Sequence, residues 1–330
     1  MTPSLKSRLD VWAPYAVLPV LAIIALPTMA FSSWLTLTIA GLAMGMLLFL
    51  MASGLTLIFG LMDVLNFAHG AFITLGAYVA VSVLGGLTGW MGADSLALNL
   101  IALFIAILVA AVAGGAAGIV FERVIVRRVY GTHLRQILIT VGGLIVAEQL
   151  FVVFWGPDTL PLPKPLTLRG AVSLGAASIE KYRILCLVLG LAVAAAMQWV
   201  LTRTRIGLLI RAGVENREMV EALGYRIRRL FVAIFAAGTA LAALGGVMWA
   251  QYQEAVTSRI GSDLTILVFI VLIIGGLGSV GGCFVGAILV GLVANYTAFL
   301  VPKLALGSNI LVMVLILLWR PRGLFPVAKW

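Results

Sequence analysis

The chain has 330 residues, of which 63% are hydrophobic and 10% are charged, and its mean hydropathy is +1.17. Soluble globular domains are about half apolar and about one quarter charged, so this composition excludes a soluble protein. The net charge of +10 could suggest nucleic-acid binding, but the basic residues lie between apolar runs, as is typical of membrane proteins.

Apolar runs of membrane-crossing length recur along the whole chain. A helix needs about 20 apolar residues to cross a bilayer, and these runs lack the alternation of barrel strands. We therefore predict an all-α polytopic membrane protein with about 8–10 transmembrane helices. The runs lie near residues 14–31, 35–59, 67–84, 96–120, 136–155, 184–202, 230–251, 263–277, 279–301 and 306–319.

The first informative interruption lies in residues 52–78, where Asp63, Asn66 and His69 break an apolar sequence next to Gly70. Hydrocarbon offers no partner for polar side chains or unpaired backbone groups, so this segment must be sheltered by protein or by a water-filled path. Broken helices often line the route of a transported solute. Asn66, His69 and Gly70 are therefore candidate path residues. A polar turn between two spans is the alternative.

Glu148 lies inside the predicted span 136–155. An acidic residue at the centre of a span costs about 2.5–3.5 kcal/mol on insertion scales, so Glu148 should face the interior of the bundle. It is a further candidate for the path, and a hydrogen-bonded structural acid is the alternative. Cys186 and Cys283 lie far apart in apolar runs, and no cluster at ligand spacing surrounds His69, so we predict no metal site.

Basic residues concentrate in four regions: near the N-terminus, at 123–135, at 203–229 and at 320–329. With ten spans, all four regions fall on one side of the membrane, as the positive-inside rule expects of the cytoplasm. Both termini are then predicted to be cytoplasmic. The connection 156–183 fits poorly, because its basic residues lie on the assigned outer side.

Residues 203–229 form the most distinctive loop, and they predict a short helix at 215–223 between two glycines. The apolar residues Met219, Val220 and Leu223 would lie on one face, and three acidic residues would lie beside it, namely Glu215, Glu218 and Glu221. This pattern would suit docking into a groove of a soluble partner. A helix lying on lipid headgroups is the alternative, although its acids would be repelled by anionic lipid. The predicted contact residues are Glu215, Asn216, Glu218, Met219, Glu221, Ala222, Leu223 and Gly224.

A second glycine-rich segment, residues 274–291, also lies at the junction of two predicted spans. Two such segments at corresponding positions indicate a transporter built from two repeated halves. A formal GxGxxG match occurs here, but the apolar flanks and the missing acidic residue argue against nucleotide binding. Glycines four residues apart instead predict close helix packing, as in Gly41/Gly45 and Gly114/Gly118. The predicted break and packing glycines are Gly275, Gly276, Gly278, Gly281, Gly282 and Gly286.

The stretch Asn66–Gly70 reads Asn-Phe-Ala-His-Gly and, within residues 54–78, resembles the permease of branched-chain amino acid ABC importers that carries this motif. The similarity continues through 122–128, 203–224 and 275–286 and so spans most of the chain. It implies one transmembrane permease domain over residues 1–330 in a bacterial inner membrane. The implied partners are a second related permease, two cytoplasmic ABC ATPases and a periplasmic solute-binding protein.

The resemblance further implies that the 215–224 helix is the coupling helix that contacts an ATPase. The wider ABC-permease motif, Glu-Ala-Ala followed by Gly three residues later, is only echoed by Glu221-Ala222-Leu223-Gly224. No GxxxxGK[ST] phosphate loop occurs in the chain, so ATP would be bound by partner subunits. We therefore expect no catalytic activity, no cofactor and no nucleic-acid partner for this chain.

The predicted function is an importer subunit that moves branched-chain or related small amino acids, amides or carboxylates. A self-sufficient secondary transporter or channel is the alternative. Such a protein should carry its own ion-coupling acids within the spans, and only Glu148 and the junction residue Asp63 are candidates.

Overall fold

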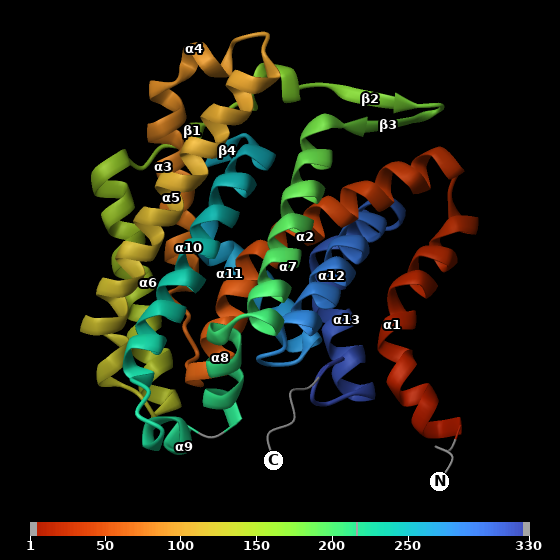
Figure 1. Ribbon diagram of the computed structural model, residues 1–330. Coiled ribbons are helices and arrows are strands. Elements are labelled where there is room, and N and C mark those ends of the chain that lie inside the picture. The colour runs from red at the N-terminus through yellow and green to blue at the C-terminus, as the bar shows by residue number, and fades with distance from the viewer. Residues whose placement is uncertain (1–4, 216, 326–330) are drawn as a thin grey trace.

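The computed structural model describes residues 5–215 and 217–325 and is helical almost throughout (Figure 1). The long helices are α1 (Leu5–Ala25), α2 (Phe31–Met62), α3 (His69–Gly86), α5 (Leu96–Val124), α6 (His133–Trp155), α7 (Lys181–Arg203), α10 (Ile227–Gln253), α11 (Ile260–Gly275), α12 (Val280–Leu300) and α13 (Ala305–Trp319). The shorter elements are α4 (Thr88–Met91), α8 (Arg205–Glu215), α9 (Arg217–Ala222), the 3-10 turns η1 (Leu26–Thr28), η2 (Val126–Arg128), η3 (Leu166–Leu168) and η4 (Pro302–Leu304), and the strands β1 (Leu160–Pro161), β2 (Ala171–Leu174), β3 (Ala177–Glu180) and β4 (Ala255–Val256).

Among the described residues, seven helices are long and apolar enough to cross a membrane: α2, α3, α5, α6, α7, α10 and α12. Shorter apolar helical stretches occur in the α1–η1 region, in α11 and in α13. Together these segments match the apolar runs of the sequence one for one, which confirms the predicted all-α polytopic class.

The long helices alternate in direction, so the described chain begins and ends at the same end of the bundle (Figure 1). We call this the lower end, and it also carries α8 and α9. The upper end carries α4, the antiparallel pair β1–β4 and the antiparallel hairpin β2–β3. The loop 203–229 therefore lies at the same end as the first and last described residues.

The helix α2 forms the centre of the bundle and crosses it obliquely (Figure 1). Its 32 residues would extend about 48 Å, which exceeds the hydrocarbon core of about 30 Å and requires a tilt. Its most apolar window is 83% buried, because α2 packs on α12, α10 and α7. A helix so enclosed can be apolar on every side.

Close packing around this centre depends on small residues. A Cβ at Gly41 or Gly45 would meet the backbone of α12, and a Cβ at Gly114 or Gly118 would meet Thr239 of α10. These contacts confirm the helix packing predicted from the two glycine pairs. They allow backbones to approach more closely than larger side chains would permit.

Two helices of the bundle end in the same unusual way. After α2, Asp63 adopts a positive φ of 52°, and after α10, Glu254 adopts a φ of 57°. Among the described residues these are the two non-glycine residues with positive φ. Each begins a return segment, defined here as residues 63–68 and 254–259, which leads to a helix that begins inside the bundle.

The helices that follow the two return segments, α3 and α11, begin in contact with each other. Gly70 at the start of α3 packs on Gly261 at the start of α11, and a Cβ on either would collide with the carbonyl of the other. Thr74 donates to the Gly70 carbonyl (3.2 Å) and accepts from the Gly261 amide (3.0 Å). Thr265 donates correspondingly to the Gly261 carbonyl (2.7 Å).

The corresponding residues of the two return segments and of the helices after them show that the chain contains two similar halves of opposite orientation. Asp63 and Glu254, Gly70 and Gly261, and Thr74 and Thr265 are separated by the same number of positions in all three pairs. The helices α2 and α10 run antiparallel (Figure 1), and so do α3 and α11. The structural counterpart of the interruption at 63–68 is therefore 254–259, and not the glycine-rich segment 274–286 that the sequence suggested.

The tight contact between α2 and α10 generates a first prediction. A Cβ at Gly54 would collide with the carbonyl of Gly238, so Gly54→Ala should lower stability by about 1–3 kcal/mol through overpacking. Thermal unfolding of the purified protein in mild detergent measures this loss. Gly85→Ala is the matched control, because Gly85 is helical and nothing lies within 4 Å of its added Cβ. Equal melting temperatures for the two variants would contradict the packing.

Candidate translocation site and coupling surface

The return segment 63–68 is held inside the bundle by two polar side chains of α6. The Leu65 amide donates to Gln136 Oε1 (3.4 Å), and the Phe67 amide donates to Thr140 Oγ1 (3.1 Å). Both Gln136 and Thr140 are buried. Their hydrogen bonds replace the water that an exposed loop would use, as a buried backbone requires.

Asn66 organises the start of α3. Its Oδ1 accepts from the Ala68 amide (3.1 Å), and its carbonyl accepts from the His69 amide (3.2 Å). Such a local turn is a common role for asparagine. The Nδ2 group of Asn66 is buried and has no hydrogen-bond partner among the described residues. Asn66 therefore retains two N–H donors directed into the protein interior.

His69 lies deep in the bundle, because its Nε2 is 2.9 Å from the Met51 carbonyl. Met51 precedes the end of α2 by about three turns, or roughly 16 Å. A carbonyl can only accept, so Nε2 carries the proton and Nδ1 is left as an acceptor. Nδ1 is buried and has no partner among the described residues. The sequence-predicted residues Asn66, His69 and Gly70 thus lie together in the interior.

Glu148 lies apart from this group. It is about two turns, or roughly 12 Å, further along α6 than Thr140. It is half-buried, and its Oε1 atom is buried with no partner among the described residues. The structure therefore brings three of the four predicted path residues together and leaves Glu148 as a separate polar position within a span.

Sequence reasoning missed several residues of this region, namely Gln136, Thr140, Gly261 and Thr265. Gln136 and Thr140 are spaced i, i+4 at the start of an apolar run, which places two polar groups on one helix face. That spacing was a usable signal. The Gly-x-x-x-Thr spacing shared by the starts of α3 and α11 was a second one.

The glycine-rich segment after α11 is a turn between two spans. Gly276 and Gly278 adopt positive φ values of 99° and 81°, which favour glycine. Gly275 and Gly282 pack backbone against backbone, Gly286 meets Val271, and Gly281 faces open space. The predicted break thus lies at the lower end of the bundle, and the predicted packing role is held by Gly275, Gly282 and Gly286.

The end of the described chain docks on this turn. The Leu324 amide donates to the Ile274 carbonyl (2.9 Å), and the Phe325 amide donates to the Gly275 carbonyl (3.0 Å). Gly323 lies against Gly276. The last carbonyls of α11, which have no partner within their own helix, are therefore satisfied by the C-terminal segment.

The predicted docking helix differs in extent from the structure. The helix α8 already begins at Arg205 and is described to Glu215, and α9 ends at Ala222, two residues before Gly224 with a φ of 85°. Asn216 lies outside the described residues, as do the side chains of Glu215 and Glu218. Within the predicted range 215–223, the described residues 217–222 are helical, as α9.

The predicted apolar face of this segment is divided in the structure. Val220 is buried, whereas the side chains of Met219 and Leu223 are 61% and 71% exposed. Successive helical residues differ by about 100°, so Val220 turns toward the protein while Met219 turns away from it. Glu221 and Ala222 are also exposed. We call the exposed residues Met219, Glu221, Ala222 and Leu223 the α9 surface.

Basic residues at the upper end are compensated by acids. Lys164 Nζ contacts Glu180 and also Glu254 (3.1 Å), Arg183 pairs with Glu180 (3.2 Å), and Arg169 donates to the Lys164 carbonyl (2.7 Å). Burial alone would lower the pKa of Lys164, but hydrogen bonds and charge from Glu180 and Glu254 raise it above its usual value. Two of the basic residues in the connection 156–183, Lys164 and Arg183, are therefore paired with acids.

The anchoring of the return segment generates a second prediction. Thr140→Val keeps the side-chain shape but removes the acceptor of the Phe67 amide, which should cost about 1–3 kcal/mol. Hydrogen exchange should then become faster at the amides of Leu65 and Phe67. Thr202→Val is the control, because its exposed hydroxyl donates only within its own helix, to Gln198 (2.7 Å). Unchanged exchange in Thr140→Val would contradict the anchoring.

The sequence of this chain is similar to those of known transport permeases. Residues 37–319 match the family model described as branched-chain amino acid transport system / permease component. The high-affinity branched-chain amino acid transport system permease protein BraD of Pseudomonas aeruginosa is 29% identical over 294 residues, covering 86% of this chain and 93% of BraD. No solved structure gives a significant match.

Two further relatives carry related descriptions. The high-affinity branched-chain amino acid transport system permease protein LivH of Escherichia coli K12 is 27% identical over 289 residues, covering 86% of this chain and 92% of LivH. The probable branched-chain amino acid transport permease protein LivM of Methanocaldococcus jannaschii is 28% identical over 142 residues, covering 38% of this chain and 41% of LivM.

Proposed function

This chain belongs to the family of permease components of branched-chain amino acid transport systems, and we propose that it is the membrane permease subunit of an ATP-driven importer. Its solutes would be branched-chain or related small amino acids, amides or carboxylates. The observation that carries the proposal is the family match, which extends from α2 to the end of α13.

The proposed importer needs further chains. They are a second, related permease, two ABC ATPases at the lower end and a solute-binding protein at the upper end. The lower end would face the cytoplasm of a bacterial cell, with both termini there, because the basic connections 123–135 and 203–229 lie at that end. ATP would be bound by the ATPase partners, since this chain has no phosphate loop.

The proposed path includes the interior groups of the first half. Asn66 Nδ2 and His69 Nδ1 are buried polar atoms without partners among the described residues, at the point where α3 and α11 begin. Helix N-termini carry partial positive charge, and broken helices direct such ends toward anionic groups of substrates in other transporters. The Asn66 donors and the helix N-termini would suit a solute carboxylate, whereas the His69 Nδ1 acceptor would suit a donor such as a solute ammonium group.

The proposed energy coupling uses the α9 surface. Short helices that present apolar side chains at a membrane boundary suit grooves of soluble partners. Exposed Met219 and Leu223 supply the apolar contacts, and Glu221 supplies charge beside them. Movement of the ATPases would then reach the bundle through α8, which packs on α2 and α7.

The coupling proposal is tested by the double variant Met219→Glu with Leu223→Glu. Placing two carboxylates in an apolar contact should lower ATP-dependent uptake by at least about tenfold, as loss of a contact hot spot does. ATPase chains should no longer copurify with the membrane-inserted variant. Trp90→Glu is the control, because Trp90 is exposed on α4 at the opposite end. Normal copurification in the double variant would refute the docking assignment.

The separate candidate Glu148 is tested as a path residue by Glu148→Gln, which keeps size and removes charge. Uptake should change by at least about fivefold, which corresponds to about 1 kcal/mol, while the melting temperature should shift by less than about 2 °C. Gln149→Asn at the adjacent exposed position is the control. Unchanged uptake with a lowered melting temperature would make Glu148 a structural acid.

A further inference from the structure

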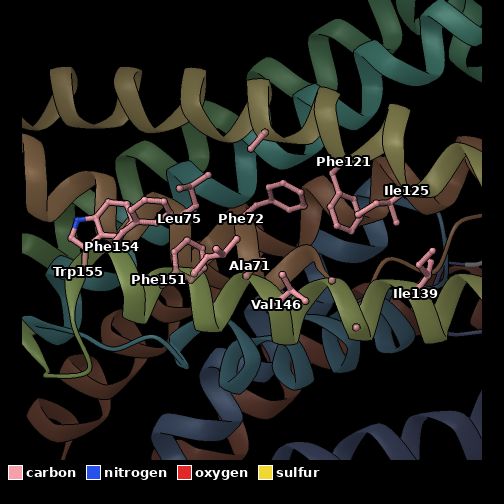
Figure 2. Close-up of a pocket in the computed structure, with 15 residues that line it drawn as sticks. Ala71, Phe72, Leu75, Phe121, Ile125, Ile139, Val146, Phe151, Phe154 and Trp155 are labelled. Carbon is pink, nitrogen blue, oxygen red and sulfur yellow. The ribbon is translucent and has the colours of Figure 1, made fainter.

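An apolar groove lies between α3, α5 and α6, with a volume of about 670 Å³ (Figure 2). Its lining includes Phe72, Phe121, Val146 and Phe151. None of the four predicted path residues belongs to the lining. Every lining side chain is hydrocarbon apart from the indole of Trp155. The groove therefore suits an apolar occupant within the depth of the membrane.

The groove has two different ends. Phe154 and Trp155 lie at one end, and Ile125 and Ile139 lie at the other (Figure 2). The first pair belongs to the last turn of α6, at the upper end of the bundle. Ile125 follows α5 and Ile139 lies near the start of α6, so the second pair lies toward the lower end.

Four arginines lie within a few residues of the side chains at the lower end of the groove. Arg123, Arg127 and Arg128 lie within three residues of Ile125, and Arg135 precedes Ile139 by one turn on the same face of α6. All four are exposed. The ion pairs of the described chain include none of them.

Neither nearby acid forms an ion pair with these arginines in the described chain. Glu122 is buried, its Oε1 accepts a hydrogen bond from Tyr130 (2.5 Å), and its Oε2 has no hydrogen-bond partner among the described residues. Asp63 lies 3.9 Å from His133. The arginine cluster is therefore a concentration of positive charge at the mouth of an apolar groove. An occupant that satisfies both parts must be apolar along most of its length and anionic at one end.

We propose that this groove binds an anionic phospholipid, with an acyl chain along α6 and the phosphate among Arg127, Arg128 and Arg135. A methylene group is similar in size to a water molecule, which occupies about 30 Å³, so the groove has room for roughly one acyl chain. Arginine forms paired hydrogen bonds to phosphate oxygens. Basic pockets between membrane helices on the cytoplasmic side are known to take anionic headgroups.

The groove can be filled without disturbing the helices around it. A Cβ at Gly142 meets nothing within 4 Å, whereas a Cβ at the adjacent Gly143 would press on the ring of Phe121. Gly142→Trp should therefore occupy the acyl-chain position. Gly307→Trp on α13 is the matched control, because a Cβ at Gly307 also meets nothing within 4 Å.

The headgroup contact is tested separately. The triple variant Arg127→Gln, Arg128→Gln and Arg135→Gln removes the proposed phosphate ligands. Its control is Arg203→Gln, Arg205→Gln and Arg211→Gln, which removes the same charge from exposed positions of α7 and α8 at the lower end. Both triple variants remove three positive charges, so a general effect of net charge on lipid binding would lower binding equally in both.

Native mass spectrometry of the full-length protein in mild detergent counts bound lipids. The probes are phosphatidylglycerol and phosphatidylcholine with identical palmitoyl and oleoyl chains. The wild type should retain one phosphatidylglycerol at least about tenfold more tightly than phosphatidylcholine. The Arg127/Arg128/Arg135 variant should lose that preference, and Gly142→Trp should lose tight binding of both lipids. The two controls should match the wild type.

Three results would overturn the proposal. They are equal retention of the two lipids by the wild type, full phosphatidylglycerol binding by Gly142→Trp, or loss of preference in both triple variants alike. If Gly142→Trp releases a copurifying permease subunit while lipid binding persists, the groove is a subunit contact and the lipid assignment is wrong.

Discussion

Backbone groups inside a membrane protein must find hydrogen bonds without bulk water, and the interior of this bundle depends on that constraint. The return segment 63–68 meets it with Gln136 and Thr140 of α6 and with the turn made by Asn66. Because those bonds hold the segment in place, α3 begins deep in the protein, with His69 bound to the Met51 carbonyl. The meeting of α3 and α11 follows from this placement.

The helix α8, which precedes the α9 surface proposed for coupling, contacts the helix that leads into the interior. The helix α8 lies against the last turn of α2, where a Cβ at Gly213 would be 3.0 Å from Leu61. Leu61 is two residues before Asp63, where the return segment begins. A displacement of α8 by a bound partner would therefore press on the helix end that positions Asn66 and His69. This contact is the physical link through which the proposed coupling would act.

Much of this arrangement could be predicted from the sequence, because the relevant signals are local. Each apolar run became a helix, and the polar residues 63–69 marked the first return segment. The second one, 254–259, lies in the connection predicted between the runs 230–251 and 263–277, but it carries no local motif comparable to residues 66–70 that would indicate a return into the bundle. The anchors Gln136 and Thr140 lie about 70 residues from their partners, so only tertiary structure identifies their role. Likewise, burial of Val220 depends on neighbours that helical periodicity does not reveal.

During membrane insertion, the two halves must enter the bilayer in opposite orientations, although their helices follow the same plan. Basic residues beside a span decide which way it inserts. In the first half, the connection between α5 and α6 carries Arg123, Arg127 and Arg128, whereas the corresponding connection between α12 and α13 carries the single basic residue Lys303. The two halves therefore differ in the basic residues beside their spans, and they are alike in the glycine and threonine contacts at the starts of α3 and α11. An evolving gene of this type can change the orientation of a half by altering its surface charges while its interior stays intact.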